Sequence, residues 1–220
     1  MIKARNICKN FTVGEQKLQV LKDVSLVIQA GEFVSLMGPS GSGKSTLLYI
    51  LSGLDKADTG SVIVNGKEIR NLNDAGESAM RRDDIGFVFQ AYNLIDNLTV
   101  EENVLIPALL DGKKRKEVND RLQELLMAVG LYEHRKHRPM ELSGGQQQRT
   151  AIARALINRP KVIFADEPTG NLDSKNGKEV LELLSKLNKQ YGITVLMITH
   201  SEESARYGSR VIRLRDGEIV

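Results

Sequence analysis

One segment of the chain fits the pattern G-x-x-x-x-G-K-S/T: Gly38-Pro39-Ser40-Gly41-Ser42-Gly43-Lys44-Ser45. It follows the apolar run Phe33–Met37 and leads into a stretch with helical character, Ser45–Leu51. A strand, a glycine-rich turn and a helix in this order are the context of a phosphate-binding loop. Glycines let backbone N–H groups converge on a phosphate, and the helix N-terminus adds partial positive charge. The segment therefore predicts an α/β core that holds a nucleoside triphosphate.

Individual residues of this loop have distinct expected roles. Lys44 is expected to reach the β- and γ-phosphates, and the Ser45 hydroxyl to ligate Mg²⁺. The nucleotide contact is predicted for the whole segment, which comprises Gly38, Pro39, Ser40, Gly41, Ser42, Gly43, Lys44, Ser45 and Thr46.

Two carboxylates stand at the end of a second apolar run. Val162–Ala165 is apolar without alternation, and Asp166 and Glu167 follow it directly. A carboxylate at a strand end beside the phosphate loop is where a nucleotide's Mg²⁺ needs a second anchor, which favours Asp166. Glu167 lies one residue further, where it can accept a proton from the attacking water. The alternative is a pair of solvated acids.

A third motif, Leu142-Ser143-Gly144-Gly145-Gln146, precedes a helical stretch at 147–158. With this pentapeptide the chain resembles the ATP-binding cassette (ABC) ATPases, and the resemblance runs from Asn6 to Ile219. It implies a P-loop NTPase core with a central, mostly parallel sheet, an antiparallel β subdomain and a small helical subdomain. It also implies ATP and Mg²⁺ as cofactors, Asp166 as the metal residue and Glu167 as the catalytic base.

The residue patterns agree with one such domain over 1–220. The dipeptide Asn65-Gly66 predicts a hairpin and hence an antiparallel layer. The run Val195–Ile198 is apolar throughout, like Val162–Ala165, as central parallel strands are, and helical spacing between the two runs predicts a βαβ unit. Helical character at 99–129, ending near Gly130, predicts the helical subdomain. We expect the core and β layer at about 1–90 and 160–220, and the helical subdomain at about 91–159.

Three further site residues rest on the resemblance. Gln90 matches the family's Q-loop, where an amide can reach Mg²⁺ or the attacking water, although alone it would be an ordinary surface amide. His200 follows an apolar strand and matches the switch histidine, which contacts the γ-phosphate, although a lone histidine is usually structural. Phe11 stands where the family stacks an aromatic ring on adenine, and a core phenylalanine is the alternative.

The signature segment raises a question of geometry. Ser143, Gly144 and Gly145 form a second glycine-rich helix N-terminus suited to a phosphate, yet the loop at Gly38 already holds one. The family's solution is a head-to-tail homodimer, in which this segment, including Gln146, closes over ATP held by the partner. Asp173 belongs to a loop, Asn171-Leu172-Asp173, that matches the family's link across that interface.

Composition narrows the class of partner. Lys and Arg number 31 against 28 Asp and Glu, a net charge of +3 that is too balanced for a nucleic-acid surface. There is no apolar run long enough for a membrane span and no signal-peptide pattern at the N-terminus, so we expect a cytosolic chain that meets the membrane through a partner. Cys8 is expected to be a buried thiol, and His134 and His137 to be solvated.

The leading hypothesis is an ATPase subunit that drives a separate integral-membrane permease from the cytoplasmic face of the membrane. The segment Asn93–Val104 is similar to the subfamily that serves macrolide export, lipoprotein release and antimicrobial-peptide resistance. The alternative is a non-transport ABC ATPase of the ribosome-associated or chromosome and repair type. Those proteins carry two cassettes or a long coiled coil, and the chain shows one cassette and no sustained heptads between Ser45 and Leu142.

Overall fold

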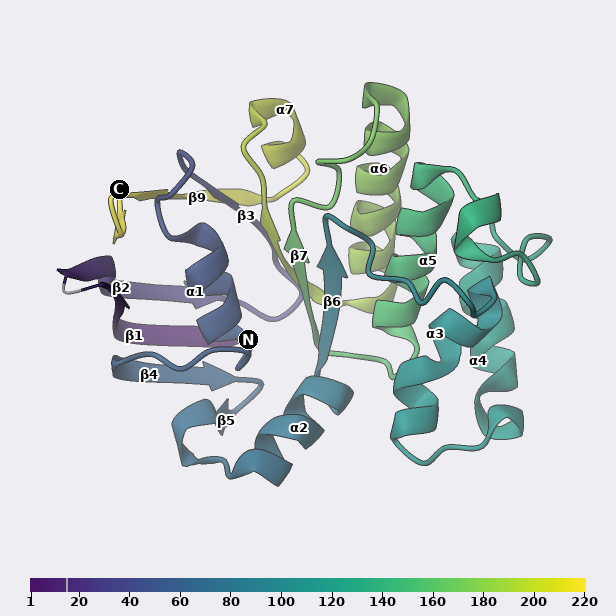
Figure 1. Cartoon of the computed structure of the whole chain (residues 1–220), viewed down its shortest axis with the longest axis horizontal. Coiled ribbons are helices and arrows are strands. Elements are labelled where there is room, and N and C mark those ends of the chain that lie inside the picture. Colours follow the sequence, from purple (N-terminus) through teal and green to yellow (C-terminus); the bar gives the residue numbers. More distant parts are fainter. Residues whose placement is uncertain (15) are drawn as a thin grey trace.

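An antiparallel sheet forms one side of the molecule (Figure 1). The structure is a computed structural model that describes residues 1–14 and 16–220. Asn65 and Gly66, at φ 49° and 82°, make the predicted hairpin turn, since both occupy the left-handed region that this turn requires. The strand order is β2-β1-β4-β5, with β1 at Ile2–Val13, β2 at Gln16–Ile28, β4 at Thr59–Val64 and β5 at Lys67–Glu68.

A six-stranded, mostly parallel sheet forms the centre. Its order is β10-β9-β3-β8-β7-β6, and only the terminal pair, β9 and β10, is antiparallel. The predicted central sheet is therefore confirmed. Its strands are β3 (Phe33–Met37), β6 (Ile85–Phe89), β7 (Val162–Asp166), β8 (Thr194–Ile198), β9 (Arg210–Arg215) and β10 (Glu218–Ile219).

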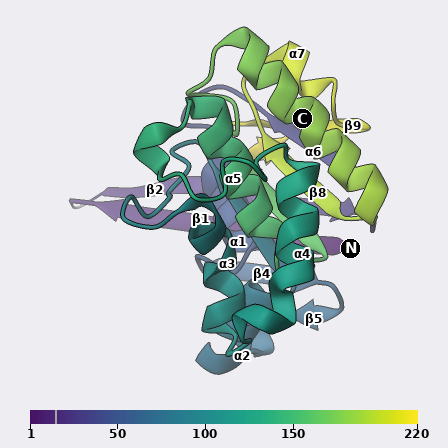
Figure 2. The ribbon, with the colours of Figure 1, turned by 90° about the vertical axis from the view of Figure 1, so that its right-hand side faces the viewer.

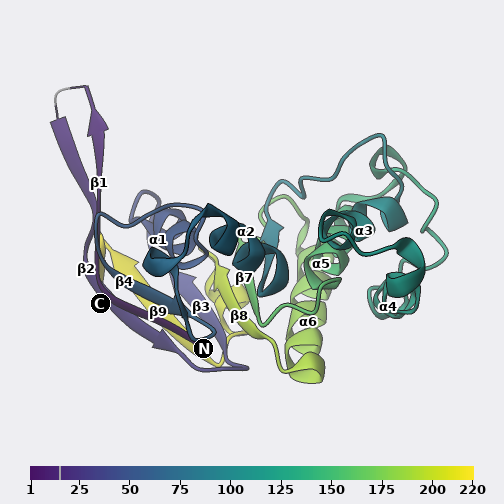
Figure 3. The ribbon, with the colours of Figure 1, turned by 90° about the horizontal axis from the view of Figure 1, so that it is seen from below.

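Helices cover the central sheet on both faces. α1 packs against strands of both sheets, whereas α5 packs on β6 and α6. α3 and α4 lie at the end of the molecule opposite β1 and β2 (Figures 1 and 3), and Figure 2 views the molecule from their side. The helices are α1 (Lys44–Leu51), α2 (Asp74–Asp83), α3 (Val100–Leu110), α4 (Arg115–Ala128), α5 (Gly144–Leu156), α6 (Ser174–Tyr191) and α7 (Glu202–Ala205), with 3-10 turns at Ile69–Asn71 and Pro139–Glu141.

Strand β7 separates two hydrophobic clusters. Val162 and Phe164 belong to the cluster that includes α1 and the antiparallel sheet, whereas Ile163 and Ala165 belong to the cluster shared with α3 to α6. Successive side chains of a strand point to opposite faces, so an unbroken apolar run is what a strand covered on both sides needs. Asp166 therefore lies at the edge of the sheet, at the end of a strand that is packed on both faces.

The stretch of helical character at 99–129 contains two helices, α3 and α4. α3 begins at a capping box made by Thr99 and Glu102, and the chain turns at Gly112, with φ 77°, before α4 starts. Gly130, with φ 68°, follows the end of α4 as predicted. Because α5 contacts both this pair and β6, the helices share a core with the sheet. The division at 91 and 159 stays a prediction.

Two expectations about polar side chains were wrong. Cys8 is half-buried instead of buried, and its Sγ accepts a hydrogen bond from the Asp23 N–H at 3.3 Å. His134 and His137 are not simply solvated, because their rings pack edge to face at 5.1 Å and both Nδ1 atoms are buried. The reason is that their segment folds over the start of α3, where His137 O accepts from Val100 N at 2.8 Å.

Candidate functional site

The glycine-rich loop lies at the carboxyl end of β3, between the sheet and α1. A Cβ at Gly38 would stand 2.0 Å from the Leu214 carbonyl oxygen, so no larger residue fits there. Gly43 has φ 98°, and a Cβ on it would stand 2.9 Å from the Val20 carbonyl oxygen. Both positions need glycine because neighbouring backbone approaches closely. The loop is thereby held against β2 and β9.

The N-terminus of α1 is left open to an anion. No side chain in the described part of the chain caps it, since the N-cap is Gly43. Backbone N–H groups in a first helical turn have no partner within the helix. Five other helices use a side chain for this purpose, from Asn73, Thr99, Ser143, Asp173 and Ser201. α4 also lacks an N-cap side-chain bond, but there Glu117 reaches back to the Lys114 N–H, whereas the uncapped start of α1 coincides with the predicted phosphate loop, where a phosphate would take the place of the cap.

The Lys44 side chain folds over this loop. Its Nζ donates to the carbonyl oxygens of Gly38 at 2.9 Å and Pro39 at 2.8 Å, and the residue is 8% exposed. Ser42 Oγ is buried and has no hydrogen-bond partner within 1–14 and 16–220. A cation and a buried hydroxyl therefore face the loop interior, where they can meet phosphate oxygens.

A cavity of about 570 Å³ opens beside the loop. It brings together residues that were predicted separately from distant parts of the sequence. Phe11 is 40% exposed, so part of its ring is open to a planar ligand, and Lys9 Nζ lies 5.1 Å from the ring centre. The lining residues are Phe11, Val20, Ser40, Gly41, Gly43, Lys44, Ser45, Thr46, Glu167 and His200.

Asp166 stands where a divalent cation would fit. Its carboxylate accepts from the Ser45 hydroxyl at 3.4 Å and from the Tyr49 hydroxyl at 3.3 Å. Burial raises the pKa of Asp166, and the negative charge of Glu167 raises it further. The hydrogen bonds from Ser45 and Tyr49 act in the opposite direction but do not cancel the increase. A desolvated carboxylate next to a hydroxyl is a hard oxygen donor set, which Mg²⁺ prefers. These residues fit Mg²⁺.

Glu167 and His200 form a pair that lines the same cavity. Glu167 Oε2 lies 3.2 Å from His200 Nδ1. Glu167 has φ 45°, which is uncommon for a non-glycine residue, and its N–H donates to the Ile198 carbonyl at 3.1 Å. This backbone turn follows β7 directly and directs the carboxylate back toward the phosphate loop. The cavity thus contains a carboxylate, an imidazole, an ammonium group and an open helix N-terminus.

A family model described as ABC transporter matches residues 21–170. The chain belongs to the ABC transporter family. It is 50% identical over 220 residues to the ABC transporter ATP-binding protein MJ1508 of Methanocaldococcus jannaschii, which it covers to 98%. It is 51% identical to the macrolide export ATP-binding/permease protein MacB of Bdellovibrio bacteriovorus, of which it spans only 33%.

A solved structure agrees with this assignment. The ATP-binding cassette MJ0796, described as a dimer in a post-hydrolysis state bound to ADP and Pi, superposes with a TM-score of 0.90 at 47% identity and full coverage of this chain. The superposition covers 96% of the MJ0796 chain. This cassette is therefore an ATP-binding ATPase subunit with the ABC ATPase fold.

Some residues predicted for the ABC site do not line the cavity. Gln90 Nε2 donates to Asn171 Oδ1 at 3.0 Å, so its side chain contacts the loop after Glu167. Ser143 and Gln146 form a capping box at the start of α5, with Ser143 N donating to Gln146 Oε1 at 2.9 Å. The signature segment Ser143–Gln146, which includes Gly144 and Gly145, is likewise absent from the cavity lining of its own chain.

Asp173 serves as a helix cap in this cassette. Its carboxylate accepts from Asn176 N at 2.9 Å and from Asn176 Nδ2 at 2.6 Å. The backbone hydrogen bond from Asn176 and then its side-chain bond hold the pKa of Asp173 below its ordinary value. Asp173 lines an adjoining cavity of about 350 Å³ that shares Glu167 and His200 with the first.

Two residues near the ABC site were missed by the sequence reasoning. Tyr49 lies four residues after Ser45 on α1, and both hydroxyls contact Asp166. That spacing places them on one helix face, so it could have revealed Tyr49 once Ser45 was chosen. Val20 lines the cavity from β2, and no local pattern marks it.

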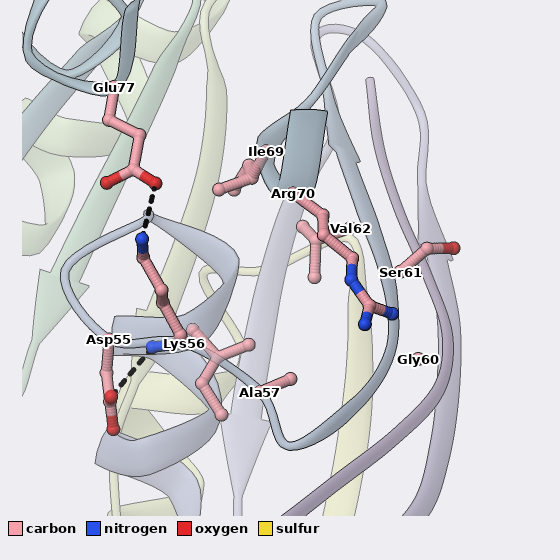
Figure 4. A pocket seen from close by; sticks show the side chains of 10 residues that line it. Asp55, Lys56, Ala57, Gly60, Ser61, Val62, Ile69, Arg70 and Glu77 are labelled. Carbon is pink, nitrogen blue, oxygen red and sulfur yellow. Dashed lines mark hydrogen bonds and ion pairs between the residues drawn. The ribbon is translucent and has the colours of Figure 1, made fainter. Parts of the chain in front are cut away.

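A separate cavity of about 240 Å³ lies between β4, the turn Ile69–Asn71 and α2 (Figure 4). Lys56 Nζ lies 3.2 Å from Glu77 Oε1, and Asp55 pairs with Lys9 at 2.8 Å. The apolar part of the cavity lining comes from Ile50, Val62 and Ile69. None of the predicted site residues lines it.

Proposed function

We propose that this cassette drives a separate integral-membrane permease of the macrolide-export and lipoprotein-release type from the cytoplasmic face of the membrane. The observation that carries the ATP-driven part of the proposal is the cavity in which the phosphate loop, Glu167 and His200 meet. The similarity to MacB over about a third of that protein supports the choice of permease type.

The triphosphate would lie along the loop from Gly38 to Thr46. The open N-terminus of α1 and Lys44 would bind its phosphates, and the exposed Phe11 ring would stack on adenine. Ser45, Asp166 and Gln90 would hold Mg²⁺, which when bound neutralises charge on the phosphates. The chain's own residues then only have to orient a water molecule and accept its proton.

Glu167 is the proposed general base. Its carboxylate is 27% exposed, so it can reach a water in the cavity while the packed strand β7 fixes its position. When both ring nitrogens of His200 carry protons, Nδ1 donates to Glu167 Oε2 and the N–H at Nε2 can donate to a γ-phosphate oxygen. The proton of the attacking water passes to Glu167, and the new P–O bond forms as the bond to ADP breaks.

The proposed working unit is a head-to-tail homodimer with two ATP molecules. Ser143–Gln146 presents a helix N-terminus but lies outside the cavity lining of its own chain. The phosphate that this segment would contact would therefore belong to ATP bound by the phosphate loop of a second copy of the chain. The dimeric state of the relative MJ0796 supports this arrangement.

Exposed apolar side chains mark a surface suited to a permease. Leu54 is 49% exposed, Leu109 48% and Leu110 75%. The last turn of α2 joins the segments that carry them, because Arg81 Nη1 donates to Gly53 O at 2.8 Å and Arg82 Nε donates to Asp111 Oδ1 at 2.7 Å. Single exposed leucines are ordinary, so the choice of this surface rests on all three lying next to residues bonded to the same helix end.

Identifying the genes beside this one and co-purifying any permease that they encode tests the proposal. We expect a permease with few spans and a large extracytoplasmic domain to be retained by the tagged cassette and to change its ATPase rate. Leu110→Asp should lose the complex, whereas Met127→Asp, at a residue 60% exposed on α4, should keep it. A neighbouring permease of another class, or a complex that survives Leu110→Asp unchanged, would contradict the proposal.

A further inference from the structure

The side-chain amide of Asn171 makes two hydrogen bonds to Gln90, one to the Gln90 backbone and one to the Gln90 side chain. Asn171 Nδ2 donates to the Gln90 carbonyl oxygen at 3.0 Å, and Gln90 Nε2 donates to Asn171 Oδ1 at 3.0 Å. The two residues stand 81 positions apart in the chain. The Gln90 side chain is therefore bonded to the loop that follows Glu167.

The backbone carbonyl of Gln90 determines which atoms of this pair donate and which accept. The Gln90 carbonyl can only accept, so Asn171 must present Nδ2 to it. Oδ1 of Asn171 then faces Gln90, which must present Nε2 in turn. The side-chain oxygen of Gln90, the atom that a metal ion would need, is left outside the pair.

The surrounding backbone is built to accommodate the pair. A Cβ at Gly170 would lie 2.6 Å from Gln90 Nε2, so glycine there leaves room for the amide. Gln148, which is 0% exposed, donates from Nε2 to Phe89 O at 3.3 Å and to Pro168 O at 2.6 Å. Gln148 thus ties the end of β6 to the loop after β7, and only the two side chains have to move for the pair to open.

We propose that Asn171 is a positioning residue that holds Gln90 away from the metal site, so that Gln90 engages Mg²⁺ only after the Gln90–Asn171 pair opens. This inference rests on the proposed metal role of Gln90. Gln90 Nε2 is bonded to Asn171 Oδ1 in this state, so the side chain has to leave that contact to turn toward the metal site. Metal-nucleotide binding and the Asn171 contact therefore compete for one side chain.

The expected size of the effect is modest, because both side chains are exposed. Two neutral hydrogen bonds at the weak end of the usual range shift an equilibrium about fivefold. Removing the pair should raise the apparent affinity for the metal-nucleotide complex by up to that factor, since the competent state no longer has to be selected from the held one.

The test compares nucleotide affinity with and without metal. Adenylyl imidodiphosphate, a non-hydrolysable ATP analogue, is titrated into the full chain in excess Mg²⁺ and in EDTA, and the ratio of the two affinities is the metal enhancement. Asn171→Leu, which keeps the shape but removes both hydrogen bonds, should raise the enhancement about fivefold and leave the EDTA affinity unchanged. Tyr92→Phe is the matched control, because it removes only a 3.4 Å bond to the Asn171 carbonyl oxygen.

A double-mutant cycle with Gln90→Ala separates this inference from the proposed function. Asn171→Leu should have no further effect on the enhancement when Gln90 is already alanine. If Gln90→Ala leaves the enhancement unchanged, the metal role of Gln90 is wrong. If Gln90→Ala lowers it but Asn171→Leu does not raise it, or raises it equally without Gln90, the positioning role of Asn171 is overturned.

Discussion

Glu167 Oε2 and His200 Nδ1 lie 3.2 Å apart in the lining of the cavity beside the phosphate loop. The two residues follow β7 and β8, which are neighbours in the parallel sheet with Asp166 paired to Ile198. Residues after adjacent parallel strands meet at the same sheet edge, where α/β proteins bind ligands. The contact between these two side chains therefore follows from the sheet order.

Replacing Glu167 by glutamine should abolish turnover and keep ATP binding, because it removes the base and leaves the phosphate loop intact. We expect the steady-state rate of phosphate release to fall by at least about 100-fold. Glu218→Gln, at an exposed residue on β10, is the control and should keep the parent rate. A Glu167→Gln rate within about tenfold of the parent would exclude the role of general base.

Lys44→Ala should weaken ATP binding. The ammonium group now lies on the carbonyls of Gly38 and Pro39 and can turn to a phosphate oxygen. Loss of a charged hydrogen bond should lower affinity about tenfold to 100-fold. Isothermal titration with Mg-ATP measures it, with Lys178→Ala on the exposed face of α6 as control. Equal affinity in parent and Lys44→Ala would show that the loop does not engage the triphosphate in this way.

The signature segment should control association. With Glu167→Gln in the background, Mg-ATP should convert a monomer, or a weak associate, into a stable dimer, because hydrolysis no longer reopens the interface. Ser143→Arg should prevent that dimer by placing a bulky cation at the N-terminus of α5, and ATP binding by the monomer should persist. Size exclusion with light scattering gives the mass.

The control for Ser143→Arg must also lose a helix cap. Asn73→Arg does so, because Asn73 Oδ1 accepts from Gly76 N at 2.8 Å at the start of α2. That variant should still dimerise. A Glu167→Gln chain that stays monomeric at saturating Mg-ATP and high protein concentration would remove the main support for the composite site.

Glu101 should make stability depend on pH in the acid range. Its side chain is 6% exposed and pairs with Lys136 at 2.6 Å and Arg115 at 2.7 Å. Burial raises the pKa of Glu101, but the hydrogen bonds and charges of Lys136 and Arg115 outweigh burial, and the pKa lies below its ordinary value. The stabilisation is therefore complete above the unfolded pKa of about 4.3 and is lost as pH falls through the folded pKa.

The variant that tests this is Glu101→Gln. Urea unfolding at pH 7 should show a loss of about 1 to 3 kcal/mol, and the difference from the parent should shrink as pH falls below about 4. Glu182→Gln, at a residue 57% exposed with its partner 3.9 Å away, should change little. A difference that stays constant with pH would mean that packing, and not charge, stabilises this position.

Local sequence patterns predicted the strands and helices that hold the site, but they could not predict contacts between residues far apart in the chain. The strand Phe33–Met37, the hairpin at Asn65 and the βαβ unit after Val162 follow from periodicity and turn chemistry within a few residues. The Gln90–Asn171 pair joins residues far apart in the chain, and no local pattern encodes such a contact.

The open N-terminus of α1 has a consequence for attempts to make this protein more robust. Adding a capping side chain is a common way to raise stability, and at Gly43 it is ruled out by the left-handed backbone and the nearby Val20 carbonyl. An acidic cap there would also compete with the substrate. The stabilisation that other helices receive from their own residues must come to α1 from ATP. Resistance to unfolding and to proteolysis is thereby linked to the cell's nucleotide supply.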